Sequence, residues 1–147
     1  YGELESKLNA VSARRDTAHA EIKRIESRSA ELALVMKHAG TYRQIKPLYD
    51  RYRKSNDKEK FLRGHESEII LFEAAARELK RLGAVPLPTT ESMKAEFANL
   101  NEEKERLLAE YKAARTEAQE YDTVKQNVDA LLAVPKEQKQ QRRHELE

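Results

Sequence analysis

The sequence predicts an all-α protein, an elongated antiparallel coiled-coil hairpin in which shorter helices form a knob between two long helices. More than half of the 147 residues are Ala, Glu, Lys, Arg or Leu, a composition typical of long helices and coiled coils. Four glycines and four prolines leave few places for turns, and no stretch alternates polar and apolar residues as a strand would. Hydrophobic residues make up 39% of the chain, which suits narrow apolar stripes better than a thick core.

The first long helix is predicted over residues 3–39. Its apolar residues recur in steps of three and four, which is the heptad spacing of one helix face that packs against a partner helix. The positions of this stripe are Leu4, Leu8, Val11, Ala18, Ile22, Ile25, Leu32 and Met36.

Gly40 and Pro47 predict a kink or short break after this helix, because proline cannot donate to the helix ladder and disfavours helical geometry in the residue before it. A short helix over residues 42–54 is expected to follow.

The next helix is predicted over residues 57–82. Asn56, followed three residues later by Glu59, has the spacing of a capping box, and Gly83 marks the C-terminal end. This helix is the most apolar of the four, with Ile70, Leu71 and Ala75 widening its stripe. The stripe itself consists of Phe61, Leu62, His65, Ile69, Phe72, Ala76 and Leu79.

The second long helix is predicted over residues 90–133, with Thr89 or Thr90 as its N-cap and an end before Pro135. Residues 135–147 form a polar, basic tail with no apolar stripe and are expected to be frayed. The heptad positions of the helix are Met93, Phe97, Leu100, Leu107, Tyr111, Ala114, Ala118, Tyr121, Val128 and Leu132.

The two heptad stripes require a cover, since an exposed apolar stripe is unfavourable. The simplest arrangement is an intramolecular antiparallel hairpin, so that residues 1–134 form a single helical domain. Pairing of the same stripes between two chains, as a homodimer, is the alternative.

Composition and charge exclude several classes of function. The formal net charge is +2, so any attraction to nucleic acid must be local. Cysteine is absent, which removes disulfides and thiolate chemistry and is compatible with a cytoplasmic location. No apolar run is long enough to span a bilayer, and no membrane partner is expected. Because the sequence starts at Tyr1 rather than at methionine, we expect a fragment of a longer polypeptide.

No catalytic residue, metal site or cofactor is predicted. The four histidines do not share a ligand spacing, and His65 with Glu68 reverses the Glu-x-x-His order of di-iron bundles. The carboxylates alternate with Lys and Arg along the helices, which is typical of solvated faces. There is no P-loop and no nucleophile elbow.

The stretch from residue 42 to residue 63 is the strongest candidate for function. It carries eight cations against three acidic residues, with Tyr42, Tyr49, Tyr52 and Phe61 among them. Cations that reach phosphates, beside rings on which bases stack, are what single-stranded nucleic-acid binding requires. The alternative, which we favour for the rings, is that they pack the knob. The candidate nucleic-acid-binding residues are Arg43, Lys46, Arg51, Tyr52, Arg53, Lys54, Lys58, Lys60 and Arg63. A weaker basic patch lies in the tail at Lys136, Lys139, Arg142 and Arg143.

The chain resembles the C-terminal helical region of relaxases (mobilisation nucleases) of mobile elements from Gram-positive bacteria. The resemblance covers most of residues 4–132 through diffuse helix positions. The matching elements are Tyr42 to Tyr52 (YRQIKPLYDRY), Lys60-Phe61, His65, Glu68-Ile69, Glu73-Ala74-Ala75, Leu87-Pro88, Met93-Lys94-Ala95-Glu96, Tyr111 and Asn127-Val128.

This resemblance implies a parent protein that nicks plasmid or transposon DNA at its transfer origin. The nucleophilic Tyr and His-rich metal motif of such proteins lie in an N-terminal domain, and neither pattern is present here, so no catalytic residue is carried over. The implied role is a non-catalytic scaffold in conjugation or mobilisation that contacts DNA or transfer-machinery proteins. The alternative is a purely structural coiled coil used for self-association or as a spacer.

Overall fold

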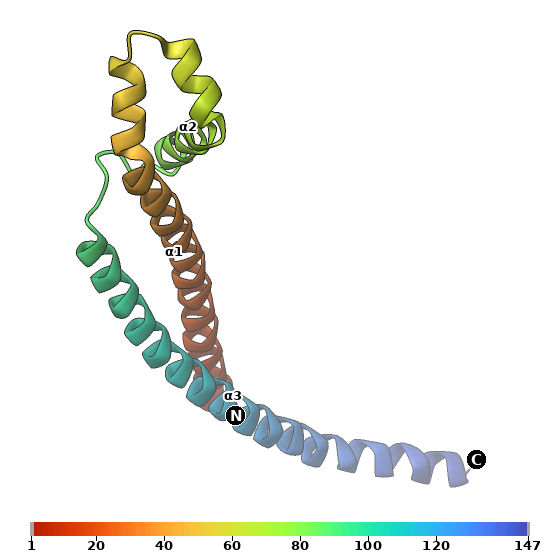
Figure 1. Cartoon of the computed structure of the whole chain (residues 1–147). Helices are drawn as coiled ribbons and strands as arrows, with labels where there is room; N and C mark the ends of the chain where they lie inside the picture. The colour runs from red at the N-terminus through yellow and green to blue at the C-terminus, as the bar shows by residue number, and fades with distance from the viewer. Residues whose placement is uncertain (1, 147) are drawn as a thin grey trace. The chain divides into compact units, whose positions relative to one another are not determined.

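A computed structural model describes the backbone of residues 2–146 and the side chains of residues 2–133. It contains α1 (Gly2–Lys54), α2 (Lys58–Arg81) and α3 (Thr90–Leu146), and the described residues include no strand (Figure 1). The predicted all-α class is therefore confirmed. None of the helices in this described part of the chain holds an apolar stretch that could cross a membrane.

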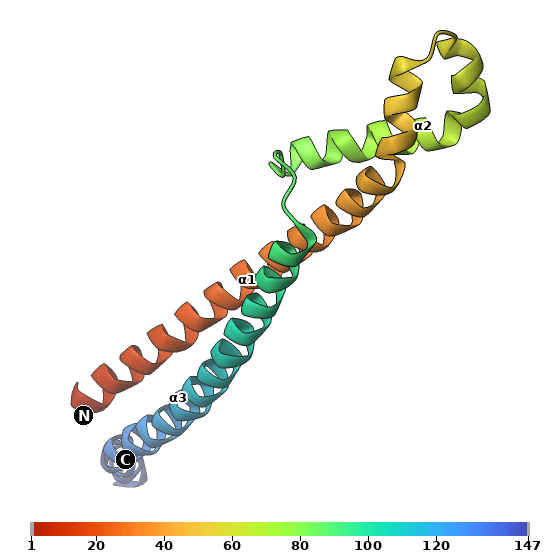
Figure 2. The ribbon, with the colours of Figure 1, turned by 60° about the vertical axis from the view of Figure 1, so that its left-hand side comes forward.

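Of the two alternatives predicted between Gly40 and Pro47, a kink or a short break, the break is wrong, because α1 is one continuous helix through both residues. Figures 1 and 2 both show α1 changing direction in its C-terminal part, as expected where a proline removes one ladder hydrogen bond and crowds the preceding turn. Leu48, the residue after Pro47, is buried, so packing holds this part of the helix against its neighbours. The separate helices predicted over residues 3–39 and 42–54 are thus two parts of α1.

Two side chains of the turn between α1 and α2, those of Ser55 and Asp57, accept hydrogen bonds from backbone N–H groups. Asp57, rather than Asn56, is the N-cap of α2, and its carboxylate accepts a hydrogen bond of 3.1 Å from the backbone N–H of Lys60. The Ser55 hydroxyl accepts a bond of 3.3 Å from the backbone N–H of Asp57. Carboxylates are favourable at this position because they satisfy a backbone donor and lie at the positive end of the helix dipole.

α2 is kinked at His65, where φ and ψ are −137° and 26° and leave the helical range. The predicted apolar stripe is consequently divided over two segments. Its C-terminal segment buries Ile69, Phe72, Ala75 and Leu79. Ile70 and Leu71, which we expected to widen the buried stripe, are more than half exposed.

The end of α2 is the predicted one. Gly83 adopts the left-handed conformation, with φ of 71°, that side chains of other residues disfavour. Its N–H donates to the carbonyl of Lys80 at 3.1 Å, and the N–H of Ala84 donates to that of Leu79 at 2.9 Å. These two bonds form a Schellman motif, which stops the helix and satisfies its last carbonyls.

α3 begins at Thr90 with Thr89 as its cap, since the Thr89 hydroxyl accepts a bond of 3.1 Å from the backbone N–H of Ser92. The predicted end before Pro135 is wrong, because the helix continues to Leu146. Most residues on either side of Pro135 are strong helix formers, although the proline itself removes a ladder bond and crowds the preceding turn. The side chains of the predicted basic tail, residues 135–147, lie outside the described residues.

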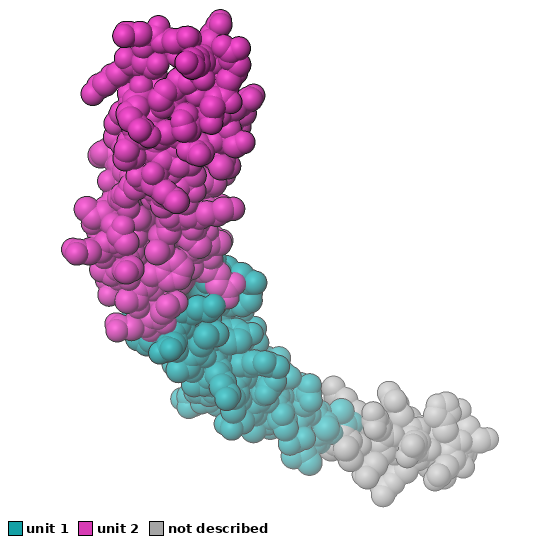
Figure 3. Space-filling view, viewed as in Figure 1, with its two compact units in different colours: residues 1–23, 103–147 teal, residues 24–102 magenta. Residues whose placement is uncertain are grey.

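The chain divides into two compact units, where we predicted a single domain over residues 1–134. Unit 1 consists of Tyr1–Lys23 and Glu103–Glu147, and unit 2 consists of Arg24–Glu102 (Figure 3). Both α1 and α3 contribute to both units. Contacts between long paired helices are local, so the residues group by position along the helices rather than around one centre.

Unit 1 packs α1 against α3 through small and medium apolar side chains. Val11, Ala114 and Ala118 form a buried cluster, against which Leu8 and Tyr121 pack. Leu132, at a predicted heptad position, is instead 65% exposed. The other buried residues of this unit are Ala18, Ile22 and Leu107.

Unit 2 contains the larger core and a bidentate ion pair between α1 and α3. Arg28 donates from Nε to Glu96 Oε1 at 2.7 Å and from Nη2 to Glu96 Oε2 at 3.1 Å. The hydrogen bond to the Glu96 carboxylate raises the pKa of Arg28 above its ordinary value. Most of the predicted heptad positions in this unit are buried. The buried residues are Ile25, Leu32, Val35, Ala39, Leu48, Ile69, Phe72, Ala75, Leu79, Ala84, Met93 and Leu100.

Candidate nucleic-acid interface

The aromatic residues of the candidate stretch pack on one another. Phe72 of α2 is buried and stacks on two rings of α1, Tyr49 at 4.2 Å and Tyr42 at 4.7 Å between ring centroids. Tyr52 lies 5.9 Å from Tyr49 and 6.0 Å from Phe61, in tilted arrangements. This packing supports the interpretation that the rings build the knob. We call the set the aromatic cluster: Tyr42, Tyr49, Tyr52, Phe61, His65 and Phe72.

Among the eight candidate cations, two use their charged groups in contacts with other residues that the structure describes. Arg43 donates from Nη1 to the Thr90 hydroxyl at 2.8 Å and from Nη2 to the carbonyl of Pro88. It therefore fastens α1 to the start of α3. Lys46 Nζ lies 3.2 Å from the Asp50 carboxylate, one turn further along α1. These contacts occupy the charged groups that a phosphate would need.

Six cations of the candidate set remain on the surface. All six are exposed, and no acidic side chain in the described part of the chain lies within ion-pair distance of them. They lie in the last turn of α1 and the first two turns of α2, on either side of the short turn at residues 55–57 (Figures 1 and 2, yellow). We call them the basic rim: Arg51, Arg53, Lys54, Lys58, Lys60 and Arg63.

Helix electrostatics explain only one half of the basic rim. Arg51, Arg53 and Lys54 complement the negative end of the α1 dipole. Lys58 and Lys60 occupy the first turn of α2, where the dipole disfavours cations by roughly 0.3–1 kcal/mol each. Their charge is thus not explained by the stability of α2, although Asp57 offsets part of the cost.

Tyr52 is the one uncharged member of the candidate set. Its side chain is half-buried between Tyr49 and Phe61, and the three rings connect α1 to α2 across the turn. The position makes Tyr52 a support for the helix ends that carry the basic rim. This role could not be deduced from spacing alone, since Phe61 belongs to the other helix.

His65 is placed by packing at the kink of α2. Its ring lies 4.8 Å from that of Phe61, and its Nδ1 is 3.9 Å from the carboxylate of Glu68. Among the side chains that the structure describes, no group of three or more His, Asp or Glu residues is close enough to hold a metal ion.

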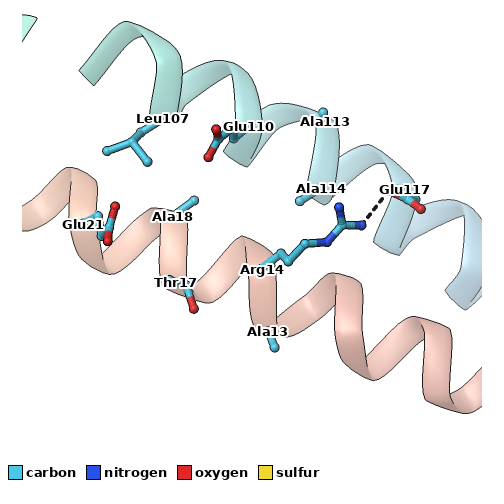
Figure 4. Close-up of a pocket in the computed structure, with 10 residues that line it drawn as sticks. All are labelled: Ala13, Arg14, Thr17, Ala18, Glu21, Leu107, Glu110, Ala113, Ala114 and Glu117. Atoms are coloured by element: carbon cyan, nitrogen blue, oxygen red, sulfur yellow. Dashed lines mark hydrogen bonds and ion pairs between the residues drawn. The ribbon is translucent and has the colours of Figure 1, made fainter. Parts of the chain in front are cut away.

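A surface groove in unit 1 was not predicted from the sequence. It has a volume of about 440 Å³ and lies between α1 and α3, with the Arg14–Glu117 ion pair at one end (Figure 4). The two charged groups of this pair are 3.1 Å apart. Alanines at facing positions leave this space, where larger side chains would fill the seam. The lining residues are Ala13, Arg14, Thr17, Ala18, Glu21, Leu107, Glu110, Ala113, Ala114 and Glu117.

Comparison with known proteins identifies no relative of this chain. The chain matches no protein-family model, no curated protein and no solved structure. The relationship to relaxases therefore stays a prediction that rests on the residues quoted above.

Proposed function

We propose that this chain is a non-catalytic helical region of a cytoplasmic conjugative or mobilisation relaxase and that it contacts DNA through the basic rim. The observation that carries the DNA contact is the set of exposed cations at the adjoining ends of α1 and α2, which have no acidic partner within the described residues. Phosphate contacts from Lys and Arg supply most of the affinity of sequence-independent DNA binding. The parentage is supported by the resemblance of residues 4–132 to the C-terminal region of that family.

The supporting architecture that we propose is the antiparallel coiled-coil hairpin. In unit 1 the contacts pair Glu5 with Lys125 and Arg14 with Glu117, so residue numbers on α3 fall as those on α1 rise. In unit 2 the pairs Arg28–Glu96 and Arg43–Thr90 follow the same order. Buried heptad positions on both helices support seam packing of this kind.

Thiol cross-linking tests the hairpin against a homodimer. The chain has no cysteine, so Arg14→Cys with Glu117→Cys provides the only two thiols. A short bifunctional thiol reagent is expected to join them within one chain and to give a product of monomer mass on denaturing gels. A product of doubled mass would favour the homodimer. In the control pair, Arg14→Cys with Glu105→Cys, the second thiol is displaced by about 18 Å along α3 and should not react with the first.

Salt dependence tests the DNA contact. The whole chain is titrated into labelled DNA at low salt and the affinity is followed by fluorescence anisotropy. If all six cations of the basic rim meet phosphates, the affinity is expected to fall by up to about 10³-fold between ~50 and ~200 mM salt, because each contact releases condensed counterions. Absence of binding at low salt would contradict the proposed function.

A further inference from the structure

The rings of the aromatic cluster are already in contact with other rings. Phe72 has Tyr42 and Tyr49 on it at 4.7 and 4.2 Å, and Tyr52 lies between Tyr49 and Phe61. Phe61 in turn lies 4.8 Å from His65. A nucleobase that stacked on the face covered by such a contact would compete with a neighbour that the fold has placed there.

The burial of the rings agrees with these contacts. Phe72 is only 5% exposed, and Tyr42, Tyr49, Tyr52 and Phe61 are half-buried. Proteins that bind single strands without sequence preference combine a basic surface with exposed rings on which successive bases stack. The knob has a basic surface, but its aromatic rings pack on one another in the interior of the knob.

The cations, by contrast, are fixed to two helix ends whose geometry is set by the turn. Ser55 and Asp57 close this turn with hydrogen bonds of 3.3 and 3.1 Å to backbone N–H groups. The ring contacts between Tyr52 and Phe61 connect α1 to α2 beside it. The backbone that carries the basic rim is therefore preorganised, which lowers the entropic cost of binding an ordered ligand.

We infer that the basic rim binds the phosphate backbone of duplex DNA and not the bases of a single strand, an inference that rests on the proposed DNA contact. A duplex presents about one negative charge per 1.7 Å of axis on a rigid scaffold. A single strand is less densely charged and must be ordered on binding. Without base stacking, nothing on the knob compensates that ordering.

The test compares two probes with the whole chain at one low salt concentration. One is a short blunt duplex, and the other is an oligo-dT strand that carries the same number of phosphates. We expect the duplex to bind at least about fivefold more tightly, with a salt slope near −0.9 per phosphate contact. Equal or tighter binding of oligo-dT would overturn the inference while leaving the DNA contact in place. Failure of both probes to bind would contradict the proposed function itself.

A ring substitution provides the second readout. Phe61→Leu keeps an apolar side chain beside Tyr52 but removes a face on which a base could stack. We expect the two probes to lose affinity equally, within about twofold, because any loosening of the turn affects both, whereas stacking worth ~1–3 kcal/mol would cost the single strand alone about 5- to 150-fold. A selective loss of oligo-dT binding would contradict the inference. Far-UV circular dichroism confirms that the variant is folded, and the ratio of the two probes for the unaltered chain does not depend on this variant.

Discussion

Replacing Phe72 with alanine is expected to lower the free energy of unfolding by about 3–5 kcal/mol, the usual cost of removing a buried phenylalanine. Phe72 is 5% exposed and is the ring on which both Tyr42 and Tyr49 stack. Its removal would leave a cavity between α1 and α2 and break two aromatic contacts, each worth roughly 0.5–1.5 kcal/mol beyond burial. Urea unfolding followed by the near-ultraviolet circular dichroism of the tyrosines measures the change.

Leu71→Ala is the matched control. Leu71 precedes Phe72 in the same helix but is 55% exposed, so its truncation removes little buried surface. We expect a change within about 0.5 kcal/mol, as for most surface substitutions. Equal losses in Phe72→Ala and Leu71→Ala would show that α2 does not pack on α1 through the face described here.

Reversing four charges of the basic rim is expected to weaken DNA binding by at least about a hundredfold at low salt. The variant combines Arg51→Glu, Arg53→Glu, Lys58→Glu and Lys60→Glu. In the proposed binding mode, each substitution removes a phosphate contact and adds a repulsive charge. All four side chains are exposed, so the fold should be retained, and circular dichroism checks this. Glutamine at the same positions gives a second variant that removes the contacts without repulsion, for which a smaller loss is expected.

Local signals predicted most of the helix ends, because they depend on residues close in sequence. Thr89 caps α3, and Gly83 ends α2 in the left-handed conformation that its missing side chain permits. The cap of α2 was misplaced by one residue, since Asn56 and Asp57 are both good caps and the capping-box spacing favoured the wrong one.

The prolines were the main source of error in the fold. Pro47 and Pro135 each argue for a helix end when only their neighbours in sequence are considered. α1 nevertheless continues through Pro47, where Leu48 is buried, and α3 continues through Pro135. The packing around Leu48 depends on residues distant in sequence, so it cannot be deduced from the local preference of Pro47.

The candidate site was predicted as a stretch of sequence. Which of its residues make intramolecular contacts and which form the basic rim was not predicted. Arg43 looks like any other cation of the stretch, yet it donates to Pro88 and Thr90, more than forty residues away. Lys46 could have been separated earlier, because Asp50 follows it at the helical spacing for an ion pair. What the sequence did indicate is the accumulation of positive charge, and the basic rim keeps most of it.

The most direct test of the DNA contact compares the rim variant with a second variant of the same net charge. The control combines Lys7→Glu, Lys23→Glu, Lys94→Glu and Lys112→Glu, four exposed lysines that do not belong to the basic rim. Affinity for the same duplex is measured for both variants and for the unaltered chain at one low salt concentration. We predict that the control loses at most about tenfold, through its altered overall charge, while the rim variant loses at least about a hundredfold. Equal losses in the two variants would contradict a binding site at the basic rim.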